Sequence, residues 1–196
     1  MSKTLALFDF DGTITTKDSF IEFLKFHKGN LNFLLGFTWL SPYLVAMKLG
    51  LIPNWKAKEI VLKYFLANLS VEDMKKVSAD FSLRIIPALI RNKAIDRIKK
   101  HQENGDDIYL VSASAENWLK PWCDQIGMKL IGTRLETIDG KITGKIDGNN
   151  CYGPEKVARI KAEINISNYS EIYAYGDSRG DKEMLALADH PHYKYF

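Results

Sequence analysis

The most constraining feature of this sequence is the stretch from Leu5 to Thr13, which reads LALFDFDGT. An apolar run ends abruptly at Asp9 and Asp11, and a glycine and a hydroxyl residue follow. This pattern is typical of a buried strand that stops at a polar site. Because side chains alternate along a strand, we expect Asp9 and Asp11 to point the same way while the chain stays extended.

Two carboxylates this close repel each other unless a cation lies between them, so the stretch predicts a metal site. A calcium-binding loop is the alternative, but such a loop continues with oxygen ligands at alternate positions and ends in a glutamate. The residues from Ile14 to Lys17 supply no such series. A catalytic site is favoured, since open α/β sheets bind ligands beyond the carboxyl ends of their strands.

The composition limits the class of protein. The chain has 196 residues, 46% of them hydrophobic and 26% charged, which excludes a disordered chain and suits one domain with a small inserted lobe. A net charge of +3 is too small to predict nucleic-acid binding.

No secretory signal precedes the first strand, so we expect a cytoplasmic protein, or one associated with the cytoplasmic face of a membrane. Cys123 and Cys151 have no zinc or disulfide spacing and are expected to be buried thiols.

Helical patterns dominate the next part of the chain. Ser19 and Glu22 have the spacing of a capping box, and Asn54 and Ser70 are predicted to begin further helices. An uninterrupted βαβ unit does not begin with several helices in a row after its first strand. The pattern therefore predicts an all-helical cap over 14–86, inserted into a core made of 1–13 and 87–196.

The segment 31–52 is unusually apolar and aromatic, with Pro42 near its middle. Three interpretations are open. It could form a buried helical hairpin of the cap, an interfacial element that contacts lipid through Trp39 and Tyr43, or a membrane span. The interruptions at Pro42 and Lys48 disfavour the span.

The remainder of the chain alternates strands and helices. Strands are predicted at 107–111, 129–132 and 171–175, with a hairpin over 134–147 that turns at Asp139-Gly140. Helices are predicted at 88–102, after Glu116, after Gly153 and around Met184. This order predicts an α/β fold with a parallel sheet.

Four short motifs in this order resemble those of the haloacid dehalogenase (HAD) superfamily, most of whose members are magnesium-dependent phosphatases. Each occurs at the end of a strand or the start of a helix. The motifs are Phe8 to Thr13, Ser112-Ala113, Lys156, and Gly176 to Asp181 with its Gly-Asp-x-x-x-Asp pattern. The resemblance implies a Rossmann-like core with a parallel sheet and an inserted all-helical cap of the C1 type.

The resemblance also implies roles for these residues. Asp9 would be the nucleophile that forms an aspartyl phosphate, and Asp11 the general acid and base. Mg²⁺ would be held by Asp9, the backbone carbonyl of Asp11, and Asp177. Ser112, Ala113 and Lys156 would hold the phosphate, and Asp181 would orient the metal's waters or Lys156.

The helical cap resembles that of subfamily IB, which contains phosphoserine phosphatase. Asp18 stands where the phosphoserine enzymes have a glutamate, and Ser112-Ala113-Ser114 replaces their Ser-Gly-Gly run. The apolar cap segment and the approach to Lys156 are also similar to the phosphatidylglycerophosphatase C group. The substrate is therefore either a soluble phosphorylated metabolite or a lipid phosphate reached through peripheral membrane contact of 31–52.

Two further interpretations concern other residues. A non-catalytic phosphate-binding module would have lost a catalytic position, whereas Asp9, Asp11, Lys156 and Asp177 are all present.

Arg179 is the next basic residue expected to touch substrate. The histidines do not cluster with the acidic motifs in the sequence and are expected on the surface or in packing; they are His27, His101, His190 and His192.

Overall fold

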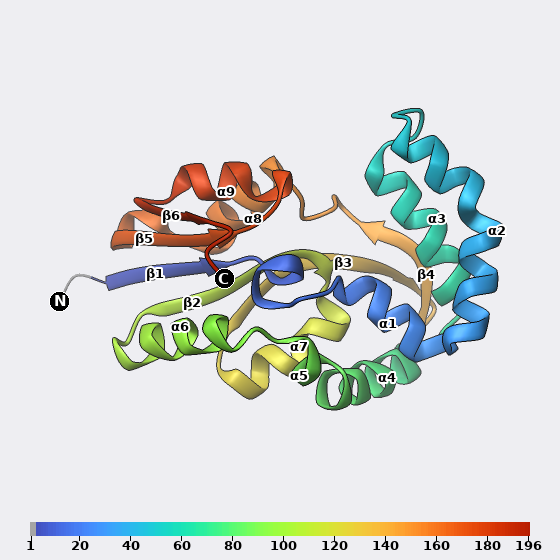
Figure 1. The fold of residues 1–196 in the computed structure, drawn as a ribbon, viewed down its shortest axis with the longest axis horizontal. Coiled ribbons are helices and arrows are strands. Elements are labelled where there is room, and N and C mark those ends of the chain that lie inside the picture. Colours follow the sequence, from blue (N-terminus) through green and yellow to red (C-terminus); the bar gives the residue numbers. More distant parts are fainter. Residues whose placement is uncertain (1–2) are drawn as a thin grey trace.

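A computed structural model describes residues 3–196 of the chain. Within this range six strands form one sheet in the order β4-β3-β2-β1-β5-β6, and only β4 runs antiparallel to its neighbour (Figure 1). The predicted α/β class is confirmed. The strands are β1 (Lys3–Phe8), β2 (Asp107–Ala115), β3 (Lys129–Ile138), β4 (Lys141–Asp147), β5 (Tyr169–Gly176) and β6 (His190–Tyr193).

Helices cover both faces of this sheet. Helices α6 (Asn92–Glu103) and α7 (Glu116–Ile126) lie on one face, and α8 (Pro154–Glu163) and α9 (Lys182–Leu187) lie on the other (Figure 1). The central strand β1 is buried on both faces, which explains its continuous apolar sequence. Its alternate side chains enter two separate cores, Leu5 and Leu7 on the α8–α9 side and Ala6 and Phe8 on the α6–α7 side.

A run of helices follows β1 before the chain returns to the sheet, and its first four α-helices belong to the proposed cap. They are α1 (Ser19–Lys28), α2 (Asn30–Lys48), α3 (Asn54–Leu66) and α4 (Val71–Arg84). The two segments that connect them to the core pair with each other, because Thr16 N donates to Leu89 O at 2.8 Å and Arg91 N donates to Ile14 O at 2.8 Å. This pairing supports our proposal that 14–86 form a cap.

The same pairing corrects one predicted helix. A single helix over 88–102 was expected, but a short α5 (Ile86–Leu89) ends at Ile90, and α6 begins at Asn92. Ile90 lies in an extended conformation and forms a β-bridge with Thr15. Tertiary pairing of the two connections thus overrides the helical pattern at this point.

The segment 31–52 also differs from the expected buried hairpin. Helix α2 continues through Pro42, and the turn to α3 comes only after Lys48, so α2 and α3 together form the hairpin. Gly36 permits their close approach, since a Cβ there would lie 2.5 Å from the Phe65 ring. The opposite face of α2 is exposed, including Leu31 and Trp39, so most of this segment is not core.

Membrane spanning, the third interpretation of this segment, finds no support in the fold. Among residues 3–196, no helix combines the length and the apolar character needed to cross a bilayer.

The predicted hairpin over 134–147 is confirmed with its turn at Asp139-Gly140, but β3 is one continuous strand from Lys129. Its far end and β4 extend under the helices that follow β1 (Figure 1). Asn68 N donates to Ile142 O at 2.9 Å, and Ile142 N donates to Leu69 O at 2.9 Å. The hairpin thus joins the sheet to the loop that connects α3 and α4.

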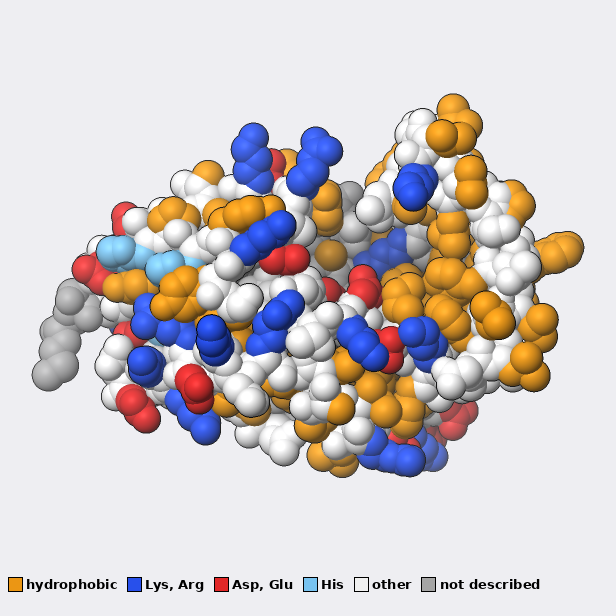
Figure 2. Space-filling model, in the orientation of Figure 1, with side chains coloured by type: hydrophobic (Ala, Val, Ile, Leu, Met, Phe, Trp, Pro, Cys, Tyr) orange, Lys and Arg blue, Asp and Glu red, His pale blue; other side chains and the backbone are white. Residues whose placement is uncertain are grey.

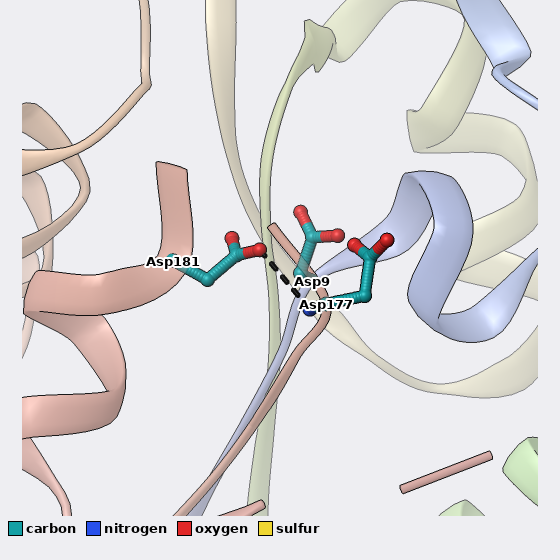
Figure 3. A group of neighbouring side chains, drawn as sticks. All are labelled: Asp9, Asp177 and Asp181. Atoms are coloured by element: carbon teal, nitrogen blue, oxygen red, sulfur yellow. Dashed lines mark hydrogen bonds between the residues drawn. The ribbon is translucent and has the colours of Figure 1, made fainter. Parts of the chain in front are cut away.

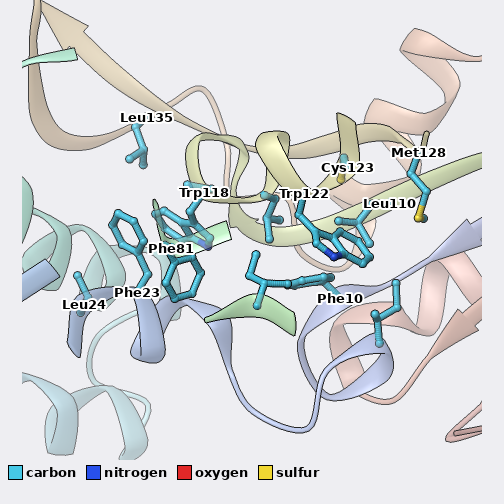
Figure 4. Close-up of a cluster of buried hydrophobic side chains, with 14 of the residues drawn as sticks. Phe10, Phe23, Leu24, Phe81, Leu110, Trp118, Trp122, Cys123, Met128 and Leu135 are labelled. Carbon is cyan, nitrogen blue, oxygen red and sulfur yellow. The ribbon is translucent and has the colours of Figure 1, made fainter. Parts of the chain in front are cut away.

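A large aromatic core holds α1 and α4 against α7 (Figure 4). The rings of Phe23 and Trp118 stack with centroids 4.7 Å apart, and Phe81 meets Phe23 edge to face at 5.3 Å. Phe10 packs on Trp122 from directly below the strand end. Because such aromatic packing contributes strongly to stability, part of the proposed cap is fixed rigidly to the core.

Candidate active site

The site begins where β1 ends. Asp9 remains extended, its backbone N–H donates to Tyr175 O on β5 at 2.9 Å, and the residue is only 6% exposed. The chain then enters a tight turn, η1 (Phe10–Ile14). Thr13 in this turn donates to Asp9 Oδ2 at 3.1 Å and contacts Asp177 Oδ1 at 3.3 Å. The turn therefore brings a hydroxyl between the first and last acidic motifs.

Gly12 is required at this turn for two reasons. Its φ of +87° lies in the region that favours glycine, and a Cβ at this position would lie 2.4 Å from Asp177 Oδ2. The Asp-x-Asp-Gly pattern thus includes the glycine because the backbone of η1 approaches the Asp177 carboxylate closely.

Lys156, at the start of α8, is 1% exposed and donates hydrogen bonds to two of the acidic side chains. Its Nζ donates to Asp9 Oδ1 at 2.6 Å, Asp181 Oδ1 at 2.6 Å and the Val111 carbonyl at 2.7 Å. An ammonium group has three N–H donors, so these contacts use all of them. Burial acts to lower the pKa of Lys156, but the two carboxylates outweigh it and raise that pKa above its ordinary value.

Asp181 also organises the loop after β5. Its Oδ2 accepts hydrogen bonds from Ser178 N at 2.9 Å and Ser178 Oγ at 2.7 Å. The same oxygen accepts from Asp177 N at 3.2 Å (Figure 3). Burial acts to raise the pKa of Asp181, but Lys156 and Ser178 hold it below its ordinary value. Both oxygens of Asp181 are engaged within the protein, which suits a residue that orients its neighbours.

Three carboxylates converge at this point, with Asp9 between Asp177 and Asp181 (Figure 3). One oxygen from each lies within 4.8 Å of the others. Oxygen donors of this kind fit Mg²⁺, which binds carboxylates and retains several waters. Burial raises the pKa of Asp9 to about 7; Lys156 acts in the opposite direction, and the neighbouring Asp181 adds to the rise.

Asp11 lies in the same cavity but in different surroundings. Its carboxylate accepts hydrogen bonds from Ser19 N at 2.5 Å and from Ser114 Oγ at 2.5 Å. Burial, together with the nearby Asp18, raises the pKa of Asp11 to about 6. Asp18 itself caps α1 by accepting from Ile21 N at 3.0 Å. Asp11 is thus a buried carboxyl whose pKa lies near neutrality.

The carboxyl-terminal part of β2 supplies further polar groups to the site. Ser112 is 1% exposed, and its Oγ accepts a hydrogen bond from Ser114 N at 3.0 Å. The Ala113 carbonyl accepts from Thr133 Oγ1 at 2.6 Å. Helix α7 begins soon after, at Glu116.

These groups surround one cavity of about 570 Å³. Its polar end contains most of the predicted site residues: Asp9, Asp11, Asp18, Ser112, Ala113, Lys156 and Asp181. Its apolar wall comes from the helices that follow β1 and includes Phe20, Phe37, Leu44, Met47 and Val61. Asp177 faces a smaller adjoining cavity of about 180 Å³ together with Gly12 and Thr13.

Arg179 and the histidines are not brought to this cavity. Arg179 is exposed, although its neighbours Ser178 and Gly180 line the wall. None of the four histidines is among the described residues that line the cavity. His101 is buried elsewhere, between Asp106 at 2.6 Å and the Tyr175 hydroxyl at 3.0 Å.

Sequence reasoning missed several residues of the site. Thr13 belongs to the first motif, but nothing in the spacing shows that its hydroxyl meets Asp177. Lys58 on α3 and Asn150 after β4 also line the cavity, and they lie far apart in the chain. No local pattern marks either of them, because only the packing of α3 over the sheet brings them together.

Comparison with known proteins agrees with this geometry. The family model for haloacid dehalogenase-like hydrolases matches residues 6–186. Protein CicA of Caulobacter vibrioides is 37% identical over 194 residues, which cover 98% of this chain and 86% of CicA. A probable phosphatase of Mycobacterium tuberculosis is 29% identical over 195 residues, which cover 96% of this chain and 68% of that protein.

Solved structures share the fold. A Bordetella pertussis protein of unknown function has a TM-score of 0.82 and 25% identity, covering 96% of this chain and 88% of that one. A phosphoserine phosphatase solved as a phospho-aspartyl intermediate analogue has a TM-score of 0.62 and 23% identity. The match covers 96% of this chain and 84% of that one. With the match to the family model over 6–186, these findings show that the chain belongs to the family of haloacid dehalogenase-like hydrolases.

Proposed function

We propose that this hydrolase is a magnesium-dependent phosphatase that passes the phosphoryl group of a monoester to Asp9 and then hydrolyses the aspartyl phosphate. One observation carries the proposal. Asp9 lies at the polar end of the cavity, where Lys156 holds Oδ1 at 2.6 Å and Thr13 holds Oδ2 at 3.1 Å. A carboxylate fixed in this way is pre-oriented for attack on a substrate in the cavity. The phosphatase relative from Mycobacterium tuberculosis supports the same reaction class.

The neighbours of Asp9 have roles that follow from their contacts. Lys156 neutralises the carboxylate, which lowers the repulsion between two anionic reactants. Asp181 fixes Lys156 from the other side at 2.6 Å. Ser112 and the backbone N–H of Ala113 lie at the same end of the cavity and are proposed to hold phosphate oxygens.

Asp11 is proposed as the general acid and base. A carboxyl with a pKa of about 6 holds a proton more readily than an ordinary aspartate and can still release it near neutral pH. It donates a proton to the leaving oxygen, and it accepts one from the water that attacks the aspartyl phosphate. The hydrogen bonds from Ser19 and Ser114 fix its direction.

Asp9, Asp177 and the backbone carbonyl of Asp11 are proposed to hold Mg²⁺. When bound, the ion supplies positive charge to the transferring phosphoryl group. Thr13 sets the separation of two of these ligands, since its hydroxyl contacts both Asp9 and Asp177. Asp181 holds the backbone N–H of Asp177 and so fixes the loop that carries this ligand.

The test is phosphate release from a panel of soluble monoesters, phosphoserine and sugar phosphates among them, with and without Mg²⁺. Asp9→Asn keeps the side-chain volume but removes the nucleophile, so we expect turnover to fall by at least about 10³-fold, on the order of 4 kcal/mol in transition-state stabilisation. Asp147→Asn, an exposed position on β4, is the matched control and should retain full activity. Wild-type turnover in Asp9→Asn would refute the nucleophile assignment.

A lipid phosphate is a second candidate substrate, and the exposed face of α2 favours it. Leu31, Leu35 and Trp39 repeat every four residues along one side of the helix and are 71%, 59% and 72% exposed. Figure 2 shows hydrophobic side chains gathered over this part of the molecule. The inner face of the same helix contributes Phe37, Leu44 and Met47 to the cavity wall, where an acyl chain could lie.

Parallel assays decide between the two substrate classes. Phosphate release is compared for dispersed phosphatidylglycerol phosphate and for the soluble panel, at equal monoester concentration. A lipid preference of a hundredfold or more, about 2.7 kcal/mol, supports peripheral contact of 31–52 with a membrane. A preference for a soluble monoester refutes it and makes the cavity wall a site for metabolites.

A further inference from the structure

Lysine side chains from the core and from the helices after β1 enter the cavity, and they differ in how many of their donors are engaged. The lysines among its described lining residues are Lys48, Lys58 and Lys156. All three N–H donors of Lys156 are used by Asp9, Asp181 and the Val111 carbonyl. Lys156 therefore cannot donate to another anion without giving up one of these bonds.

Lys58 is in a different position. It projects from α3, and its Nζ donates to the Ala113 carbonyl at 2.5 Å and to Asn150 Oδ1 at 2.9 Å. Both acceptors are neutral, so a full positive charge lies at the cavity wall without a carboxylate in hydrogen-bond contact. The ring of Phe20 covers one side, 5.8 Å from Nζ. One N–H donor is left for a ligand.

Lys58 lines the same cavity as Asp11 and Asp18. Burial lowers the pKa of Lys58 to about 8, and Asp11 and Asp18 act in the opposite direction. The ammonium group therefore remains mostly protonated at pH 7. Asp11 is the residue proposed to protonate the leaving oxygen, and it lines the same cavity as Lys58, so a leaving group bound at Asp11 shares that cavity with the ammonium group.

We propose that Lys58 is a specificity-determining residue that binds a second acidic group on the leaving group of the substrate. The preferred substrates are monoesters whose leaving group carries a carboxylate or a phosphodiester close to the ester oxygen. This inference rests on the proposed phosphatase function and narrows its substrate class. A second anion matches the unneutralised ammonium, whereas a neutral leaving group leaves it without an ionic partner.

The test compares pairs of ligands in which only one member carries the second acidic group. 3-Phosphoglycerate and glycerol 3-phosphate have the same skeleton, with a carboxylate in the first and a hydroxymethyl group in the second. Binding of each is measured by calorimetry on Asp9→Asn protein with Mg²⁺, so that neither ligand is consumed. Phosphatidylglycerol phosphate and phosphatidic acid form the equivalent lipid pair, with and without a phosphodiester. The two pairs distinguish a carboxylate from a phosphodiester as the acidic group.

We expect at least one pair to show tenfold or tighter binding of the doubly acidic member. Lys58→Met should abolish this preference, and Lys58→Arg should retain part of it. Lys56→Met, exposed on the same helix, is the matched control and should leave the preference unchanged. Circular dichroism of each variant verifies that it is folded.

Equal losses for both members of a pair in Lys58→Met would mean that Lys58 acts on the shared phosphoryl group, and would overturn the inference. The absence of any preference in both pairs would overturn it as well. Because binding is measured without turnover, the proposed function is tested separately. A wild-type protein that shows the preference but hydrolyses none of the four compounds contradicts the phosphatase proposal and not the role of Lys58.

Discussion

At the scale of single residues, the site depends on buried charges that compensate each other. Lys156 lies between Asp9 and Asp181, and all three side chains are less than 10% exposed. Removing one member of such a group leaves the others buried and unpaired, which costs far more than losing an exposed ion pair. The same arrangement that positions the nucleophile therefore also makes the core sensitive to substitution.

Lys156→Met should accordingly reduce the free energy of unfolding by about 3–5 kcal/mol near pH 8. The loss should be smaller at pH 5, because Asp9, whose pKa is already raised to about 7, is then protonated and needs no cation. Urea denaturation at the two pH values measures this. Lys161→Met, exposed on the same helix, should change stability by less than about 0.5 kcal/mol at either pH. A loss that does not vary with pH would contradict the role given to Asp9.

Gly12 offers a second prediction at this scale. Gly12→Ala should weaken Mg²⁺ binding about tenfold or more, because the new Cβ would lie 2.4 Å from Asp177 Oδ2 and displace a proposed metal ligand. Gly50→Ala is the matched control, since Gly50 has a similar φ of +76° but no atom within 4 Å of its Cβ position. Mg²⁺ titration of both variants separates the steric effect from the backbone strain that they share. Equal Mg²⁺ affinities would exclude the steric explanation.

At the scale of elements, α2 is the least conventional helix of the fold. Only Gly36 and Leu40 are fully buried along its length, although its sequence is apolar on all sides. A helix of a water-soluble protein normally shows a polar outer face. The exposed leucines and Trp39 are therefore the strongest indication that α2 has a further contact surface.

If that surface is an anionic membrane, Leu35→Ser combined with Trp39→Ser should reduce sedimentation with anionic vesicles at least fivefold, since both side chains are more than half exposed. The proposed site should be unaffected, because neither residue lines the cavity. Leu83→Ser on α4 removes a leucine that is 63% exposed and is the control for general surface hydrophobicity. Equal recovery in the supernatant with and without vesicles, for the unmodified protein, would rule out this contact.

At the scale of the whole molecule, burial of the acidic groups makes stability depend on pH. Asp9 and Asp11 have pKa values raised from 3.8 to about 7 and about 6. The folded protein thus binds more protons than the unfolded chain between about pH 4 and pH 7. By linkage, its free energy of unfolding decreases as the pH rises through this window.

Thermal unfolding measured from pH 5 to pH 8 should therefore show a metal-free melting temperature that falls as the pH rises. Added Mg²⁺ should raise that temperature more at pH 8 than at pH 5, because protons compete with the ion for the same carboxylates. In Asp9→Asn the decline should be shallower. A Mg²⁺ effect that is equal at both pH values would show that the ion binds elsewhere.

The sequence by itself determined the elements whose signal is local. Asp9 and Asp11, Ser112, and the Gly-Asp-x-x-x-Asp pattern after β5 each follow an apolar run, although β2 continues through Ser112 to Ala115 instead of ending before it. Parallel strands place such ends along one edge of the sheet, so their order predicts that these polar residues lie near one another. The lysine at the start of α8 was identified only by the resemblance to the family's motifs.

Only the tertiary structure decided features that depend on contacts between distant segments. β6 was missed because His190–Tyr193 is a short edge strand that contains a proline and becomes a strand only by pairing with β5. The break before α6 comes from pairing with Thr15, and the exposure of α2 depends on which of its faces α3 covers. Lys58 meets Ala113 and Asn150 across 55 and 92 residues of sequence. The local sequence pattern determines which side chains lie at a strand end. Long-range packing determines which side chains from other segments lie opposite them.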